Sequence, residues 1–485
     1  MEKYKKNIST KILDFVEGLP KFQKGLIHDL QEIRIRQRKC ASNEITNRSC
    51  PDGIDVKLSN ITLTLTFEHE EYHTVTKGLR HYFPKNEKVK KFISSLKKSE
   101  DRIHASSWHN LGYISKERGF FLPDTEIDEN LPNAVKGVSL SFHRILPSMS
   151  CIIFEFYLND LVSEELRRIQ NKDYIGPVIF KQFWPIKHLS RGYSMGTGNQ
   201  CAIEAISDYK DTVRELLERW IQKGFGWEPR TIDAVSYIDV FEIKGNPKDI
   251  DERKKWILEN STWLNEYGIS TRGFDAYEGE NLLLSRAISN DQKYMLSDSI
   301  AKLDSCTESE LGDLIEYKVR AVAISSTIFS VIEKYGRKVE TLRAHGFKNL
   351  YKRKKLTKKS QSNIQELKRT IAILSRLQHE LSGSKVWIAH SISEIGELKN
   401  LARDESYNLA KNTILNSKFQ LNKVKEAADI IDSGLTNYLS VQSIYVMYKL
   451  QKWMFILSIV VTIATIVGVL SGWDNLKSLL PDEVA

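Results

Sequence analysis

The clearest formal match to a catalytic motif lies near the N-terminus, in the run FEHEEYHTV. His69, Glu70 and His73 have the spacing of the HExxH motif, in which two histidines hold Zn²⁺ and the glutamate activates the bound water. However, the alternating run ITLTLTF ends only two residues before His69, so a helix would barely have started there. No third ligand stands out. A zinc hydrolase is therefore the third-ranked hypothesis, and we expect neither a metal nor a cofactor.

A second distinctive group is a basic run between two helical patterns. Clustered basic side chains can hold the phosphates of an anionic lipid or a nucleotide, but most such runs only solvate a helix tip, and both interpretations stay open. Nucleic acid is not the expected partner because few aromatic residues are interleaved with the charges. The members of this group are Lys352, Arg353, Lys354, Lys355, Lys358 and Lys359.

The third group lies in an apolar segment near the C-terminus. Small and hydroxylated residues recur there at spacings of four, three and three, which places them on one face of a helix. Such a face could line a water-filled pore, or it could let two helices pack closely without a channel. Because both interpretations need more than one copy, we expect a homo-oligomer. The residues are Ser458, Thr462, Thr465 and Gly468.

The apolar segment itself has the length of a membrane span. Residues 453–473 contain no charge, and at about 1.5 Å per residue they cover roughly 30 Å, the thickness of a bilayer's hydrocarbon core. Trp453 and Trp473 stand where indoles prefer the interface, and Lys452 and Asp474 bracket them. The start MEKYKKNISTKILDF has no signal-peptide core, so the body is expected in the cytoplasm. This predicts a single-pass membrane protein with a short external tail over residues 474–485.

Composition is consistent with a cytosolic body but does not select its partner. Lysine and arginine number 71 against 62 acidic residues, a net charge of +9 that suits an anionic lipid surface without requiring one. The cysteines are odd in number and have no CxxC spacing, which argues for reduced thiols rather than a disulfide framework. The five are Cys40, Cys50, Cys151, Cys201 and Cys306.

Strand and helix patterns divide the chain near residue 290. Before it, runs such as IDVKLSNITLTLTF and CIIFEFYL alternate with helical patterns, which predicts an α+β domain over residues 1–290. After it the strand signals disappear, and residues 291–452 are predicted to form a helical hairpin and a long coiled-coil stalk. Ile388 to Lys452 lacks proline and is expected to run as one helix. The heptad positions are Ile364, Leu367, Ile371, Leu374 and Leu381.

This architecture resembles the CorA-type divalent-cation channel family, in the run IIDSGLTNYLSVQSIYVMYKLQKWMFILSIVVTIATIVGVLSGW. The resemblance implies a homo-oligomer in which the span lines a pore for ions. In that family the first span ends in a Gly-Met-Asn signature and a second span follows. Here the corresponding residues are Ser471, Gly472 and Trp473, and no second apolar run follows. The hairpin carries YKRKKLTKK, whereas that of the family is typically acidic.

The sequence therefore predicts an α+β cytosolic domain, a long α-helical stalk and one C-terminal transmembrane helix. We expect the cytosolic domain to sense a ligand or partner and to relay this through the stalk to the span. The span would be an ion-conducting pore or a membrane effector in a homo-oligomer. The alternative is a membrane-anchored scaffold or sensor that does not conduct, and the sequence does not demand an enzyme.

Overall fold

The structure falls into two packing units. The first, which we call the sheet unit, contains Met1–Lys334 and His379–Lys418; the second, the helical unit, contains Tyr335–Gln378 and Phe419–Ala485. The computed structural model describes residues 54–68, 71–98, 108–117, 125–171, 178–180, 193–195, 198–226, 235–245, 247, 249–269, 275–277, 282–288, 296–303, 308–351, 358–395, 397–400 and 406–477.

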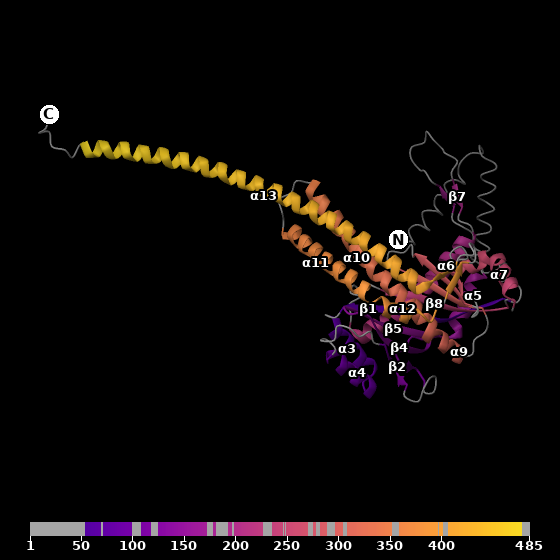
Figure 1. The fold of residues 1–485 in the computed structure, drawn as a ribbon. Coiled ribbons are helices and arrows are strands. Elements are labelled where there is room, and N and C mark those ends of the chain that lie inside the picture. Colours follow the sequence, from indigo (N-terminus) through magenta and orange to yellow (C-terminus); the bar gives the residue numbers. More distant parts are fainter. Residues whose placement is uncertain are drawn as a thin grey trace, which may run out of the picture. The chain divides into compact units, whose positions relative to one another are not determined.

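A large mixed sheet forms the centre of the sheet unit (Figure 1). Its strand order is β13-β12-β9-β10-β11-β8-β1-β5-β4-β2-β3, and neighbours are antiparallel except for the parallel pairs β11/β8 and β2/β3. The separate strands β6 (Val178–Phe180) and β7 (Tyr193–Met195) pair with each other. The large sheet contains β1 (Asp55–Glu68), β2 (Trp108–Ser115), β3 (Glu126–Ile127), β4 (Val135–Leu146), β5 (Met149–Leu158), β8 (Val235–Lys244), β9 (Asp275–Tyr277), β10 (Leu282–Ile288), β11 (Leu296–Lys302), β12 (Glu397–Asn400) and β13 (Ser406–Asn408).

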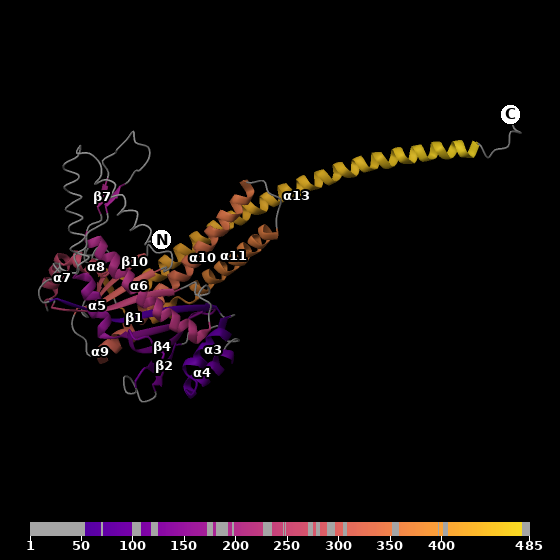
Figure 2. The same ribbon diagram turned by 180° about the vertical axis from the view of Figure 1, so that it is seen from behind.

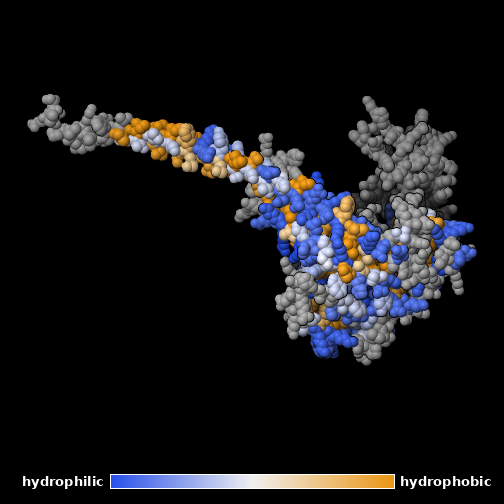
Figure 3. Space-filling model, viewed as in Figure 1, coloured by the Kyte–Doolittle hydropathy of each residue, from blue (hydrophilic) through white to orange (hydrophobic). Residues whose placement is uncertain are grey.

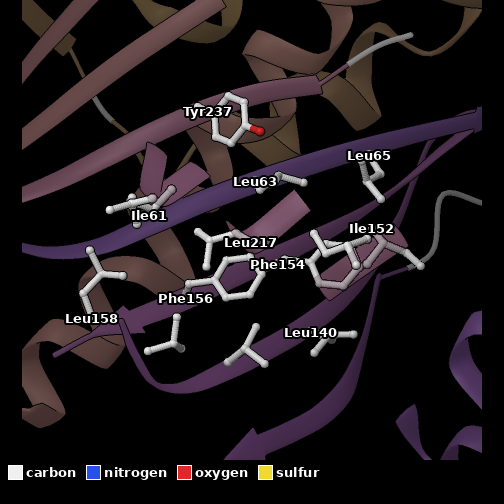
Figure 4. Close-up of a cluster of buried hydrophobic side chains, with 14 of the residues drawn as sticks. Ile61, Leu63, Leu65, Leu140, Ile152, Phe154, Phe156, Leu158, Leu217 and Tyr237 are labelled. Atoms are coloured by element: carbon white, nitrogen blue, oxygen red, sulfur yellow. The ribbon is translucent and has the colours of Figure 1, made fainter. Parts of the chain in front are cut away.

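One face of this sheet is apolar and carries the main core. In β1, residues Ile61, Leu63 and Leu65 alternate with threonines, so the apolar side chains share one face. Leu63 lies opposite Phe154 of β5, and Figure 4 shows Leu217 of α6 packed with these side chains. The helices on the sheet unit's chain up to residue 266 are α3 (Tyr72–Tyr82), α4 (Glu87–Lys98), α5 (Asp160–Gln170), α6 (Gly198–Phe225), α7 (Ile250–Glu259) and α8 (Ser261–Glu266) (Figure 2).

Helices α3 and α6 approach each other closely because of a glycine. A Cβ atom at Gly78 of α3 would lie only 2.0 Å from the ring of Phe225, so no larger residue fits without displacing that ring. Four residues later, the Tyr82 hydroxyl donates a hydrogen bond of 2.7 Å to the Trp220 carbonyl oxygen. Gly78 therefore fixes how closely the two helices pack.

The opposite face of the sheet is polar and meets the helix that leads into the second unit. Asn60, Thr62 and Thr64 of β1 lie on this face and are at most 1% exposed. Side chains of α10 (Arg320–Tyr351) reach it: Arg320 bonds Glu155 and Ser326 bonds Asp298. Before α10 come α9 (Glu308–Asp313) and the π-helical turn η3 (Leu314–Val319), which together continue into α10 without a break.

Parts of three helices form the described portion of the helical unit, and both ribbon views show them side by side (Figures 1 and 2). They are α10, α11 (Lys358–Gly383) and α13 (Leu409–Lys477). Lys338 of α10 pairs with Glu366 of α11, and the Gln378 amide of α11 donates to Asn422 of α13 over 2.8 Å. The predicted heptad positions Leu367, Leu374 and Leu381 are buried, and Ile364 and Ile371 are half-buried.

Two expectations for the chain beyond residue 290 are wrong. Strands do not cease there, because β11, β12 and β13 all join the large sheet. Ile388–Lys452 is not one helix either: α12 (Lys385–Ile392) ends, β12 and β13 follow, and α13 begins at Leu409. The physical reason is long-range pairing, since Leu398 lies opposite Tyr277 of β9 and the sheet edge supplies bonds that a local helix would otherwise provide. The domain boundaries at residues 290, 452 and 473 stay predictions.

Candidate functional site

Helix α13 is the first candidate for a functional site, because one end of it is apolar and exposed. It runs for 69 residues without a break, and in the part of the chain that the structure describes it is the one helix long and apolar enough to cross a membrane. Every described side chain from Gln451 to Val469 is exposed, and Figure 3 shows an apolar surface along this end of the helix. Soluble monomers rarely expose a contiguous apolar surface of this extent, which marks a site for contact with lipid or protein.

The predicted polar face of this segment lies on α13 as one stripe. At about 100° per residue, Ser458, Thr462 and Thr465 fall within about 60° of one another, and Gly468 lies about 60° further round. The Thr462 hydroxyl donates to the Ser458 carbonyl oxygen and the Thr465 hydroxyl to that of Val461, both over 2.8 Å. Each donor is therefore satisfied within the helix, while the hydroxyl oxygens can still accept a bond. The stripe can exist in lipid or face water.

The other end of α13 is embedded in the sheet unit. The Asn408 side chain accepts a hydrogen bond of 3.0 Å from the Lys411 backbone N–H, which caps the start of the helix. Leu409 and Ala410 are buried, and the hydroxyls of Thr413 and Ser325 of α10 are 2.8 Å apart. The first turns of α13 are thus held against the first turns of α10.

Helix α10 is in turn fixed to the sheet by a buried ion pair. Arg320 donates from Nε to Oε1 of Glu155 over 2.6 Å and from Nη2 to Oε2 over 3.2 Å, and both side chains are almost fully buried. Its guanidinium also lies 5.5 Å from the ring of Trp108 and 3.3 Å from Glu316. Burial alone would lower the pKa of Arg320, but attraction to Glu155 outweighs it and raises that pKa. The π-helical turn η3 ends directly before this residue, and such turns often mark functional positions.

The polar sheet face near this ion pair contains several buried groups without a hydrogen-bond partner. They include the Nδ2 atom of Asn60 and the hydroxyls of Thr64, Ser139 and Ser236. Thr64 and Ser236 lie directly opposite each other on β1 and β8. A buried polar group without a partner costs about 1–3 kcal/mol, so water or a polar ligand entering this layer would be stabilised.

A second buried charge network lies on the apolar face. Asp239 of β8 accepts hydrogen bonds of 2.8 Å from Lys210 and of 2.8 and 2.9 Å from Arg214, both on α6. Desolvation would raise the pKa of Asp239, but the two cations lower it overall. Lys210 also donates to the Tyr267 carbonyl oxygen over 2.9 Å. The network ties α6 to the sheet. Because its charged groups bond to one another, we assign the network a structural role.

The predicted zinc and phosphate residues are only partly described. His69 and Glu70 lie outside the described residues, whereas His73 lies in the first turn of α3 with its Nε2 atom 3.2 Å from the Thr74 hydroxyl. Across the described ranges, no three His, Cys, Asp or Glu side chains form a group that could hold a metal ion. Lys358 and Lys359 begin α11, and the other predicted basic residues, Lys352, Arg353, Lys354 and Lys355, lie outside the described residues.

Sequence reasoning missed the two buried charge networks, although a signal was present. Glu155 interrupts the apolar run CIIFEFYL, Asp239 interrupts VSYIDVFEI, and Arg320 stands in KVRAVAISS. A single charge inside an apolar run is buried when the run is a core strand or helix, and a buried charge needs a partner. The partners themselves could not be assigned, because Arg320 lies 165 residues after Glu155.

Comparisons with known proteins add little to this description. No protein-family model and no curated protein matches the chain. Among solved structures the chain is similar to the CorA magnesium transporter from Methanocaldococcus jannaschii, with 12% identity, 53% of this chain and 83% of that chain covered, and a TM-score of 0.25. It is also similar to the full-length CmaX protein, with 9% identity, 53% and 80% coverage and a TM-score of 0.18. Both likenesses are too weak to define a common fold.

Proposed function

We propose that this protein is tethered to a membrane by α13 and couples its sheet unit to that membrane. One observation carries the proposal: a single uninterrupted helix has its first turns buried in the sheet unit and its far end apolar and exposed over a bilayer's length. A helix that only anchored the chain could be joined to the body by a flexible linker. A helix that is continuous from the core of the sheet unit to the proposed span can transmit a movement of one to the other.

The sheet unit is the proposed sensor for a ligand or partner. Support comes from the polar sheet face, where unpartnered buried groups such as Thr64 and Ser236 would gain hydrogen bonds from a bound molecule. The same face holds Arg320 and Ser326 of α10. A ligand that competes for these bonds would shift α10, and the Ser325–Thr413 contact would pass the shift to α13.

The proposed output is a homo-oligomeric span that acts as an ion-conducting pore or membrane effector. The hydroxyl stripe supports self-association, because lone anchors need no such face. A non-conducting scaffold or sensor is the second candidate. It is favoured by the bonds that Thr462 and Thr465 make to their own helix, since hydroxyls satisfied in this way need no water-filled axis. The cytoplasmic position of the body and the external C-terminus belong to the same proposal.

Cell fractionation and external proteolysis test the tether. The full-length chain should sediment with membranes, and a chain ending at Lys452 should appear in the soluble fraction. A full-length variant with Ile463→Lys and Val467→Lys serves as a control, because two charges mid-span oppose insertion. Protease outside intact cells should remove at most the last dozen residues. Membrane attachment of the truncated chain, or external digestion of the sheet unit, would contradict the proposal.

A further inference from the structure

Within the helical unit, α13 has two apolar faces, and only one of them is covered. Leu421, Ala428 and Leu435 are buried against the other helices. Phe419, Ile430 and Val441 are equally apolar, yet they are 57%, 65% and 65% exposed. At about 100° per residue, Ile430 lies roughly 160° around the helix from Ala428. The exposed residues therefore form a stripe on the outer side of α13.

The stripe is regular and follows the helix axis. Phe419, Ile430 and Val441 are spaced eleven residues apart. Eleven residues make about three turns, so each successive position drifts by only about 20°. An 11-residue apolar repeat keeps one line of a helix turned toward a neighbour, so the row suits a second helix that runs alongside α13.

The charges on the same side of α13 indicate what covers the stripe. Lys423 and Glu426 lie between Phe419 and Ile430, are exposed, and fall within about 60° of each other on the helix. The Lys423 ammonium lies 4.3 Å from the centre of the Phe419 ring. A surface that carries one lysine and one glutamate is self-complementary, because Lys423 of one copy can pair with Glu426 of another. A partner with a single sign of charge would meet repulsion at one of the two.

The direction of α13 points to the same occupant. The stripe belongs to the helix whose far end is the proposed span. A partner that covers the whole row must run beside α13 at the same height above the bilayer. Other copies of this chain, inserted in the same membrane with the same orientation, do this without further machinery.

We propose that the outer stripe of α13, formed by Phe419, Ile430 and Val441, is the seam along which parallel copies of this chain associate. The proposal rests on the proposed function, a membrane-tethered homo-oligomer, and specifies which face forms the contact. The helices α10 and α11 then lie outside that seam on each copy.

Cysteine cross-linking in membranes tests the seam with the full chain. Ile430→Cys and Val441→Cys are compared with Thr436→Cys, an exposed position about 120° around the helix from Ile430. Under a mild oxidant, the two seam variants should give at least tenfold more disulfide-linked dimer than the control. The background retains buried Cys151 and replaces Cys40, Cys50, Cys201 and Cys306 with serine.

Equal cross-linking at all three positions, or none at Ile430→Cys and Val441→Cys, would overturn the seam. The mass of the wild-type complex in detergent distinguishes a failure of the seam from a failure of the proposed function. A multiple of the 55.9 kDa chain without seam cross-links means that the copies associate by another face. A mass of one chain refutes the homo-oligomer and the seam together, although the membrane tether would still stand.

A charge variant gives a second, independent readout. Phe419→Asp combined with Ile430→Asp should raise the protein concentration needed for half-assembly at least tenfold, whereas Gln420→Asp combined with Thr436→Asp should change it less than twofold. All four side chains are exposed, so helix content by circular dichroism should stay at the wild-type value. Equal assembly of both double variants would contradict the seam.

Discussion

At the scale of single residues, buried charges decide which element packs on which face of the sheet. Glu155 points to the polar face and accepts from Arg320, whereas Asp239 points to the apolar face and accepts from Lys210 and Arg214. Removing one member of such a pair leaves a buried charge without its partner and costs about 3–5 kcal/mol. These residues therefore specify the arrangement more than they stabilise it.

The Glu155–Arg320 pair can be tested with a double-mutant cycle. We expect Arg320→Met to lower the free energy of unfolding by about 3–5 kcal/mol, because it strands a buried carboxylate. Adding Glu155→Gln removes that charge and should recover more than half of the loss. Denaturant unfolding followed by tryptophan fluorescence measures both. Additive effects of the two changes would show that the side chains do not interact.

Stability should also depend on pH through Asp239. Its folded pKa is lowered, because attraction to Arg214 and Lys210 outweighs the desolvation that would raise it. The stabilisation is therefore present above the unfolded pKa of about 3.9 and is lost as pH falls through the folded pKa. We expect Asp239→Asn to be less stable at pH 7 and to lose less stability between about pH 5 and pH 2 than the wild type. A parallel pH profile would argue against this assignment.

Two threonines on β1 provide a matched test of the polar sheet face. Thr62 donates a hydrogen bond of 2.8 Å to Asn60, whereas the Thr64 hydroxyl has no partner, and both are buried on the same face. In the ligand-free protein, Thr62→Val should cost about 1 kcal/mol, and Thr64→Val should be neutral or stabilising. Thermal unfolding compares them. A clear loss for Thr64→Val would mean that water or a ligand already bonds its hydroxyl.

At the scale of elements, local periodicity predicts some parts of the fold and not others. The run ITLTLTF alternates and became β1, and the uncharged run beyond Trp453 became the far end of α13. Strands β12 and β13 are short, polar and at the sheet edge, so their local pattern resembles that of a loop. They form because β9 lies alongside, and Tyr277 is far from Leu398 in the sequence. The sequence places Ser458 and Thr462 on one face for the same local reason, but it could not pair Glu155 with Arg320.

The polar stripe of α13 leads to a prediction about one helix face. We expect Thr462→Leu to hinder assembly or conduction, because a bulky side chain would enter the shared face. Val460→Leu should be tolerated, since Val460 lies about 160° around the helix from Thr462. Complex mass in detergent and ion flux from reconstituted vesicles measure both effects. Identical behaviour of the two variants would leave the segment a simple anchor.

At the scale of the whole molecule, three described helices run from one unit into the other. Helix α10 crosses after residue 334, α11 after residue 378 and α13 after residue 418. A movement of α10 at its contact with Glu155 can thus reach the helical unit through α10 itself and through Thr413 of α13.

The two ends of α13 should contribute differently to the stability of the fold. None of the apolar window that could cross a membrane is buried against the rest of the chain, whereas Leu409, Ala410 and Leu421 are buried. A chain ending at Lys452 should therefore unfold within about 0.5 kcal/mol of the full-length protein in detergent, because the side chains described from Trp453 to Val469 are exposed and do not contribute to the core. A chain ending at Asn408 should be several kcal/mol less stable, since buried apolar side chains contribute about 1.5–3 kcal/mol each. Chemical unfolding of the three proteins measures this order, and a marked loss on removing residues 453–485 would show that the span packs on the body instead of meeting lipid.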